Sequence, residues 1–197
     1  MKHHRIDAGG RFPALHVNSL EREAKTDISQ PGEAFDWRMV VVFRGRHCPM
    51  CTRYLNQLTT YVPRLRELGV DVVAVSGDSH EQLTRHLEKI NINFPIYYGL
   101  TIEQMRQLGL YISHPRSPKE TDHPFAEPGV FVINEHGTVQ VVDISNNPFV
   151  RPELKTLVSG LAWIRRPDNN YPIRGTYTYS APEAGSHSLP ARPQALH

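Results

Sequence analysis

Two cysteines, Cys48 and Cys51, are the residues of this chain whose type and spacing best suit chemistry. They are the only cysteines among 197 residues, and they bracket Pro49 and Met50. A thiolate can attack a disulfide to form a mixed disulfide, and a second thiol one helical turn away can then resolve it. The pair therefore predicts a site that cycles between a dithiol and a disulfide.

Two other interpretations of the pair stay open. The cysteines could be buried and inert, since unpaired cysteines often pack as small hydrophobic residues. They could also form half of a metal site, which His47 or a second subunit would have to complete because zinc normally takes four ligands. A metal- or partner-binding protein without turnover is thus the alternative to an enzyme.

The neighbouring residues place the pair where a strand leads into a helix. The β-branched run Met39–Phe43 predicts a buried central strand, and apolar residues recur at helical spacing over residues 52–68. Pro49 suits the first position of that helix. Cys48 is then the helix cap, and the backbone N–H of Cys51 points toward its sulfur.

A helix start favours a thiolate, because its free N–H groups and its dipole stabilise negative charge. The pKa of a cysteine at this position can fall well below the free value of about 8.5. Arg44, Arg46 and His47 precede the pair and would add positive charge. Each of the three could equally be a solvated loop residue.

Strand and helix patterns alternate along the rest of the chain. Strands are expected at residues 12–17, 39–43, 70–76, 94–98, 129–134 and 138–144, and helices at residues 52–68, 78–90, 101–109 and 152–164. Asp78 with Glu81 and Thr101 with Gln104 are predicted capping boxes. Parallel crossover units, followed by an antiparallel hairpin and a closing helix, predict an α/β sandwich with a mixed central sheet.

The length and composition are those of one domain with extended ends. At about 150 residues per domain, 197 residues correspond to a single domain with appendages. Only 39% of the residues are hydrophobic, and the last stretch is rich in proline. We expect a flexible N-terminus at residues 1–10, the folded domain at 11–166 and an extended tail at 167–197.

The charge balance excludes some functions. Lys plus Arg is 22 and Asp plus Glu is 20, so neither nucleic acid nor an anionic membrane is the expected partner. No run of about 20 apolar residues and no secretory signal is present, which predicts a cytoplasmic protein. Two cysteines also exclude a disulfide-stapled scaffold or a four-cysteine metal site within one chain.

The sequence resembles a known family. The segment Val40–Cys51 looks like the active-site strand and turn of thioredoxin-fold proteins, and it is most similar to the peroxiredoxin-like branch of the alkyl hydroperoxide reductase/thiol-specific antioxidant (AhpC/TSA) superfamily. The resemblance runs from Phe12 to Tyr177, through residues 69–76, 128–134, 147–154 and 169–177. It implies a thioredoxin-like three-layer sandwich with a peroxiredoxin-type N-terminal extension, and it implies no cofactor.

The chain departs from the peroxiredoxin motif Pro-x-x-x-Thr-x-x-Cys. Counted back from Cys51, the threonine and proline positions hold Cys48 and Arg44; counted back from Cys48, they hold Gly45 and Val41. Without that threonine, peroxide reduction lacks part of its usual electrostatic support. Dithiol–disulfide exchange is therefore preferred over a dedicated peroxidase.

Two further residues gain a role from the resemblance alone. Pro128 occupies the place of the family's catalytic arginine and instead resembles the cis-proline that faces the disulfide in thioredoxins. Arg151 matches a second arginine that opens the last helix in peroxiredoxins. The likeness to thioredoxins names Cys48 as the attacking residue, whereas the likeness to peroxiredoxins names Cys51.

We therefore predict a thiol–disulfide oxidoreductase with Cys48 and Cys51 as its catalytic residues. An atypical thiol peroxidase acting on hydroperoxides is the second enzyme hypothesis. The implied partners are a disulfide-bearing protein or a small disulfide, together with an external thiol reductant such as a thioredoxin or glutathione system. A homodimer is compatible with the resemblance.

Overall fold

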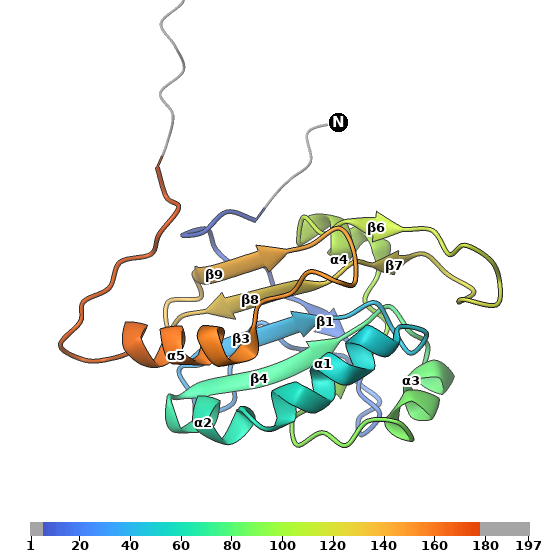
Figure 1. The fold of residues 1–197 in the computed structure, drawn as a ribbon, viewed down its shortest axis with the longest axis horizontal. Coiled ribbons are helices and arrows are strands. Elements are labelled where there is room, and N and C mark those ends of the chain that lie inside the picture. The colour runs from blue at the N-terminus through green and yellow to red at the C-terminus, as the bar shows by residue number, and fades with distance from the viewer. Residues whose placement is uncertain (1–5, 178–197) are drawn as a thin grey trace, which may run out of the picture.

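A five-stranded sheet forms the centre of the computed structural model, which describes residues 6–177 (Figure 1). Its strands are β3 (Trp37–Val42), β4 (Val70–Val75), β5 (Ile96–Tyr97), β8 (Gly129–Ile133) and β9 (Val139–Ile144). They lie in the order β5-β4-β3-β8-β9. β3, β4 and β5 are parallel, whereas β8 is antiparallel to β3 and β9 is antiparallel to β8. The predicted mixed sheet is confirmed.

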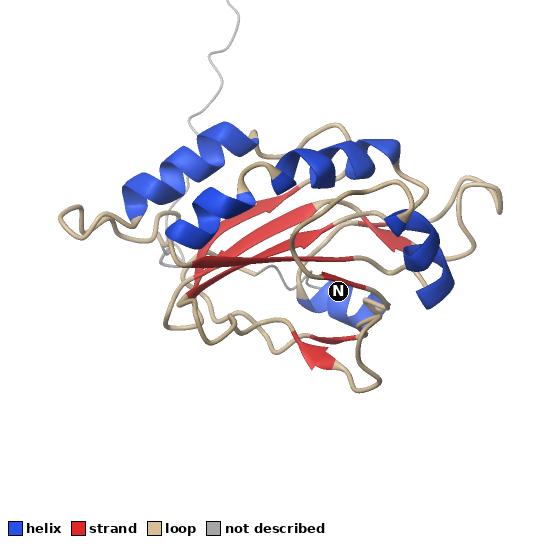
Figure 2. Ribbon diagram, turned by 90° about the horizontal axis from the view of Figure 1, so that it is seen from below, coloured by secondary structure: helices blue, strands red, loops and turns tan. Residues whose placement is uncertain are grey.

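Helices on the two faces of the sheet make three layers (Figure 2). α1 (Pro49–Thr59), α2 (Val62–Glu67) and α5 (Leu154–Ile164) cover one face. The other face carries α4 (Ile102–Gln107) and the two short strands β1 (His16–Val17) and β2 (Thr26–Asp27). α3 (His80–Leu87) and the strand pair β6 (Ile112–Ser113) and β7 (Phe125–Ala126) lie near the start of α1 (Figure 1). The predicted α/β sandwich is confirmed.

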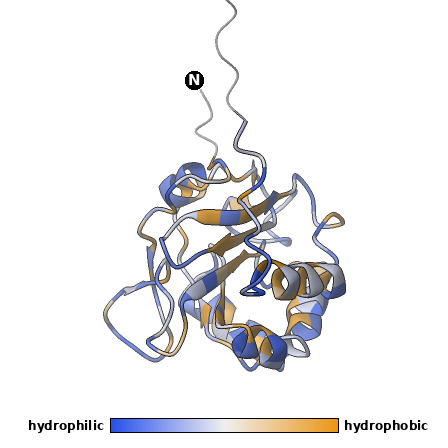
Figure 3. Cartoon of the chain, turned by 90° about the vertical axis from the view of Figure 1, so that its left-hand side faces the viewer, coloured by the Kyte–Doolittle hydropathy of each residue, from blue (hydrophilic) through white to orange (hydrophobic). Residues whose placement is uncertain are grey.

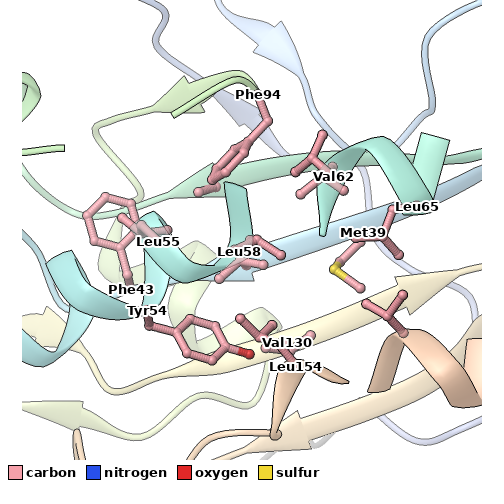
Figure 4. Packing of buried hydrophobic residues seen from close by; sticks show 14 of the residues in the cluster. Met39, Phe43, Tyr54, Leu55, Leu58, Val62, Leu65, Phe94, Val130 and Leu154 are labelled. Atoms are coloured by element: carbon pink, nitrogen blue, oxygen red, sulfur yellow. The ribbon is translucent and has the colours of Figure 1, made fainter. Parts of the chain in front are cut away.

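Two apolar layers, one on each face of the sheet, fix the helices in place. All six residues of β3 are buried, and they alternate between the layers. Met39 packs with Leu58 and Val62 beneath α1 and α2 (Figure 4). Figure 3 shows the same separation, with hydrophobic residues on the strands and hydrophilic residues on the outer sides of the helices. Burial contributes on the order of 2 kcal/mol for each large apolar side chain, so α1 is held firmly over β3.

The helix predicted at residues 52–68 begins earlier and is divided. α1 starts at Pro49, and the backbone turns at residues 60–61 before α2 begins at Val62. Pro63 explains the break, because a proline lacks the N–H that would continue the helical hydrogen bonds. The division leaves α1 as a separate helix whose first turn carries both cysteines.

Two of the four predicted helix starts differ from the structure in their capping residue. The capping box of Thr101 and Gln104 is confirmed. The box of α3 is formed by Ser79 and Gln82, because the carboxylate of Asp78 instead accepts a backbone N–H from the loop before Cys48. The last helix begins at Leu154 with Glu153 as its cap, so the predicted start at residue 152 was two residues early.

The chain ends are described only in part. Residues 1–5 of the expected flexible N-terminus and residues 178–197 of the expected tail lie outside the described residues. Residues 6–10 lie instead against β9: Ile6 is buried, and the backbone N–H of Gly9 donates to Val139 at 2.9 Å. Within residues 6–177, no helix is long and apolar enough to cross a membrane.

Candidate active site

Cys48 is the N-cap of α1, as predicted. Its sulfur accepts the backbone N–H of Cys51 at 3.3 Å, and Pro49 takes the first helical position. The carboxyl end of β3 leads directly into this turn, so the packing of β3 and α1 fixes where the sulfur lies. Both cysteines are reduced, and their exposed fractions are 1% for Cys48 and 0% for Cys51.

The two sulfurs share one proton, and the negative charge rests on Cys48. The hydrogen bond from the Cys51 thiol is the largest cause that lowers the pKa of Cys48, to about 5. The backbone N–H of Cys51 and the Arg44 side chain act in the same direction, against the effect of burial. Because the pKa lies well below 7, Cys48 is a thiolate at neutral pH.

Cys51 is the protonated partner. Burial raises its pKa well above the usual value, and the neighbouring Cys48 raises it further. The Arg151 guanidinium donates to the Cys51 sulfur at 2.8 Å, and the backbone N–H of Arg44 donates at 3.4 Å. These two contacts favour the Cys51 thiolate but do not outweigh burial. The site thus pairs one thiolate with one protonated thiol.

Arg151 reaches the site from the loop before α5. Its guanidinium also donates to the carbonyl of Pro148 and lies 5.4 Å from the centre of the Tyr54 ring. Tyr54 in turn donates its hydroxyl to the carbonyl of Pro152 at 3.2 Å, and Figure 4 shows its ring beneath α1, directed toward α5. These contacts hold the guanidinium beside the Cys51 sulfur.

Arg44 is held by two carboxylates rather than solvated. Its guanidinium lies 3.2 Å from Glu127 and 3.8 Å from Glu120, and it stacks 4.6 Å from the centre of the Phe125 ring. Glu127 is 3% exposed and also accepts the hydroxyl of Ser113 at 2.7 Å. Arg44 therefore brings its positive charge close to Cys48 on a fixed side chain.

The loop between β3 and α1 is tied to Asp78. This buried carboxylate accepts the backbone N–H of Arg46 at 2.8 Å. Gly45 has a φ of +128°, and a Cβ there would lie 2.4 Å from the Asp78 carboxylate. Arg46 thus contributes its backbone N–H to this contact. Asp78 was predicted as a helix cap, and its contact with the loop was missed.

His47 does not contribute charge to the thiolate. Burial lowers its pKa to about 4, and the positive charge of Arg44 acts in the same direction. The ring is neutral at pH 7 and packs against Phe125, with 4.5 Å between ring centres. Its role in this structure is therefore packing of the loop.

His86 is a second buried histidine that the sequence did not single out. Its Nε2 lies 2.9 Å from the Thr52 hydroxyl, and that hydroxyl donates to the carbonyl of Cys48 at 3.4 Å. Burial lowers the pKa of His86 to about 4, so it is neutral at pH 7. It links α3 to the first turn of α1, a contact between segments that only the fold brings together.

A small cavity lies behind Cys51. Its volume is about 10 Å³, which is close to the room that one water molecule needs. Among the residues that line it are Cys51, Tyr54, Pro128, Asp143 and Arg151. The fold thus brings residues of the β8–β9 hairpin and of the loop before α5 to the cysteine pair.

The prediction of a cis peptide bond before Pro128 was wrong. No cis peptide bond occurs within residues 6–177, and the bond before Pro128 is trans. Pro128 leads straight into β8, and its carbonyl accepts the backbone N–H of Ser145, so it extends the β8–β9 pairing. Its position beside Cys51 in the cavity lining still brings it to the site.

The described residues offer no metal centre. Within residues 6–177, no group of three or more His, Cys, Asp or Glu side chains is placed to hold a metal ion. Besides the Cys51 thiol itself, the groups that donate hydrogen bonds to the two sulfurs are guanidinium groups and backbone N–H groups.

The fold and the site define a thioredoxin-like α/β protein with a paired-thiol centre. The sequence profile of the AhpC/TSA family matches residues 8–142, more than half of the chain. The chain belongs to the AhpC/TSA family, as the sequence resemblance implied. No match was found among the curated proteins.

Solved structures that match this fold include peroxiredoxins and AhpC proteins. A cysteine-to-serine mutant of peroxiredoxin 6 from Arenicola marina matches with a TM-score of 0.66 and 16% identity, over 81% of this chain and 74% of that one. A peroxiredoxin-like protein from Aquifex aeolicus matches with a TM-score of 0.62 and 18% identity, over 81% and 88% of the two chains. AhpC of Mycobacterium tuberculosis gives 0.62 and 15%, over 82% and 94%.

These matches confirm the predicted thioredoxin-like fold. Membership of the AhpC/TSA family supports an oxidoreductase with a thiol-dependent redox function. The matched residues include both cysteines, whereas Asp143 and Arg151 lie beyond their end.

Proposed function

We propose that the protein is a thiol–disulfide oxidoreductase that cycles Cys48 and Cys51 between a dithiol and a disulfide. The observation that carries this proposal is the helix cap, in which the Cys51 N–H donates to the Cys48 sulfur at 3.3 Å. One thiolate and one reserve thiol, a single helical turn apart, are what two-step exchange needs.

The cycle has three steps. The Cys48 thiolate attacks a substrate disulfide, so that a Cys48–substrate bond forms and one substrate thiolate leaves. Cys51 then loses its proton and attacks the Cys48 sulfur, which forms the Cys48–Cys51 disulfide and releases the second substrate thiolate. An external thiol reductant, such as a thioredoxin or glutathione system, returns two electrons and one proton to the pair, which restores the Cys48 thiolate and the Cys51 thiol.

Access to the site limits the substrate. Cys48 is 1% exposed and Cys51 is fully buried, so the side chains over Cys48 must move before a disulfide can reach it. Attack must also be in line with the substrate's sulfur–sulfur bond. We therefore expect small or extended disulfides to react faster than disulfides buried in folded proteins.

A thiolate titration tests the first step of this proposal. The ultraviolet absorbance of the thiolate should appear with a midpoint of about 5 and should be absent at that pH in the Cys48→Ser variant. Because the pKa is lowered, the thiolate is present above pH 5 and is lost as the pH falls through 5. A midpoint at or above the free-cysteine value of about 8.5 would contradict the proposal.

Peroxide reduction is the second candidate function, and Arg151 is the observation that favours it. A guanidinium 2.8 Å from the Cys51 sulfur can stabilise charge as the thiolate attacks a peroxide oxygen. Cys51 would become a sulfenic acid as the oxygen–oxygen bond breaks, and Cys48 would then displace hydroxide to form the disulfide. Because the shared proton rests on Cys51, exchange through Cys48 is the first proposal.

Substitution of Arg151 separates the two candidates. If the peroxidase operates, Arg151→Gln should slow oxidation by hydrogen peroxide about tenfold or more in stopped-flow measurements. Arg53→Gln is the matched control, since it removes the same charge from an exposed position of α1. A rate for the unmodified protein no faster than that of a free thiol would eliminate the peroxidase.

A further inference from the structure

We propose that Asp143 is the proton acceptor for Cys51 in the resolving step of the cycle. The inference rests on the proposed dithiol function and adds a residue that the cysteine motif does not contain. It follows from the position of Asp143 on β9, the cavity that it shares with Cys51, and the need to remove a proton from a fully buried thiol.

Sheet register places Asp143 on the face beneath α1. Asp143 pairs with Val130 on β8, and Val130 pairs with Val41 on β3, so the three form one row across the sheet. Val41 and Val130 belong to the apolar layer under α1, as does Val141, two residues before Asp143. Side chains two residues apart on a strand share a face. A carboxylate therefore occupies an inward position at the edge of this layer.

No stabilising contact explains why a carboxylate occupies this inward position of β9. Among the described residues, no hydrogen bond or ion pair engages the side chain of Asp143. Even partial burial of a carboxylate without a partner costs some free energy, so the position brings no benefit for folding alone. Reversible protonation during the reaction would give this carboxylate a chemical role.

The cavity joins the carboxylate to the thiol. Cys51 and Asp143 both line it, and its volume of about 10 Å³ is close to what a single bridging water needs. Cys51 is 0% exposed, so bulk solvent takes its proton only slowly at neutral pH. Asp143 is only half-buried, so its carboxylate can exchange a proton with solvent.

The surrounding charges suit proton transfer. Burial raises the pKa of Asp143, which makes it a stronger base than an ordinary aspartate. Tyr54 stays neutral because burial raises its pKa, and Arg151 places a positive charge beside the Cys51 sulfur. Besides Cys51 and Asp143, the titratable or charged groups that line the cavity are Tyr54 on α1 and Arg151 in the loop before α5.

The resolving step moves one proton and exchanges one disulfide bond for another. The proton of Cys51 passes to Asp143 while the Cys51 sulfur attacks the sulfur of Cys48. The Cys48–Cys51 bond forms, the Cys48–substrate bond breaks, and the substrate leaves as a thiolate. Asp143 releases the proton to solvent before the next cycle. Arg151 stabilises the thiolate character that develops on Cys51 during the attack.

An aromatic disulfide that releases a coloured thiolate tests the inference in stopped-flow measurements. The unmodified protein should release two equivalents, the first from attack by Cys48 and the second from resolution by Cys51. In Asp143→Asn we expect an unchanged first phase and a second phase that is at least about tenfold slower at pH 7. The slow phase should recover as the pH rises, because hydroxide then removes the Cys51 proton.

The controls separate this role from a structural one. Asp7→Asn makes the same change at an exposed position and should leave both phases unaltered. A second phase of unchanged rate and pH dependence in Asp143→Asn would overturn the inference, and so would equal slowing of both phases. Only one released equivalent from the unmodified protein would instead show that the dithiol cycle itself is wrong.

Discussion

The Cys51→Ser variant is expected to accumulate as a stable mixed disulfide through Cys48. Its Cys48 keeps the cap position and the backbone N–H of residue 51, so it can still attack a substrate disulfide. The variant lacks the thiol that would release the substrate, so resolution stops. Intact-mass measurement after incubation with glutathione disulfide should show one glutathione per chain, removed by an added thiol reductant.

The Cys48→Ser variant is the matched control. Its remaining Cys51 is fully buried and has a pKa raised by burial, so we expect little or no glutathione adduct under the same conditions. If Cys48→Ser instead formed the adduct and Cys51→Ser did not, Cys51 would be the attacking residue. That result would favour the peroxidase over the exchange cycle.

Gly45→Ala is expected to have the largest effect on stability. The φ of +128° at Gly45 is strained for any residue with a Cβ, and the new Cβ would lie 2.4 Å from the buried Asp78 carboxylate. Backbone strain and overpacking together should lower the free energy of unfolding by about 3 kcal/mol or more. Denaturant unfolding measures this, and the thiolate of Cys48 should become less stable as its loop shifts.

Gly160→Ala is the control for the glycine substitution. Gly160 lies within α5, and a Cβ there meets no atom within 4 Å. Alanine in a helix interior is more stable than glycine by about 0.5–1 kcal/mol, so this variant should gain stability. A Gly45→Ala variant as stable as the unmodified protein would contradict the close approach of Asp78 to the loop.

The local part of the site could be predicted from the sequence. A β-branched strand, then Cys48 and Pro49, then helical spacing define a helix cap through neighbours along the chain alone. The structure confirms this cap, with the Cys51 N–H on the Cys48 sulfur. Local signals were less reliable where two polar residues competed, as at Asp78, which binds the loop and leaves the cap to Ser79.

The remaining part of the site depends on contacts between distant segments. Arg151 lies 100 residues after Cys51, and no local pattern shows that its guanidinium reaches that sulfur. Asp143 offers a weak signal, since it alternates with Val141 and so takes an inward position. The protonation of His47 was equally hidden, because it depends on burial against Phe125.

The mass of the oxidised protein tests the dithiol cycle most directly. The unmodified protein should be incubated in glutathione redox buffers of increasing potential and analysed, after acid quenching, as the intact monomer. We predict a single oxidised form that is lighter by two hydrogen atoms, with a disulfide joining Cys48 and Cys51. Two results would contradict the dithiol cycle. One is oxidation that ends with glutathione attached to the separate cysteines, and the other is oxidation that forms only disulfides between two chains.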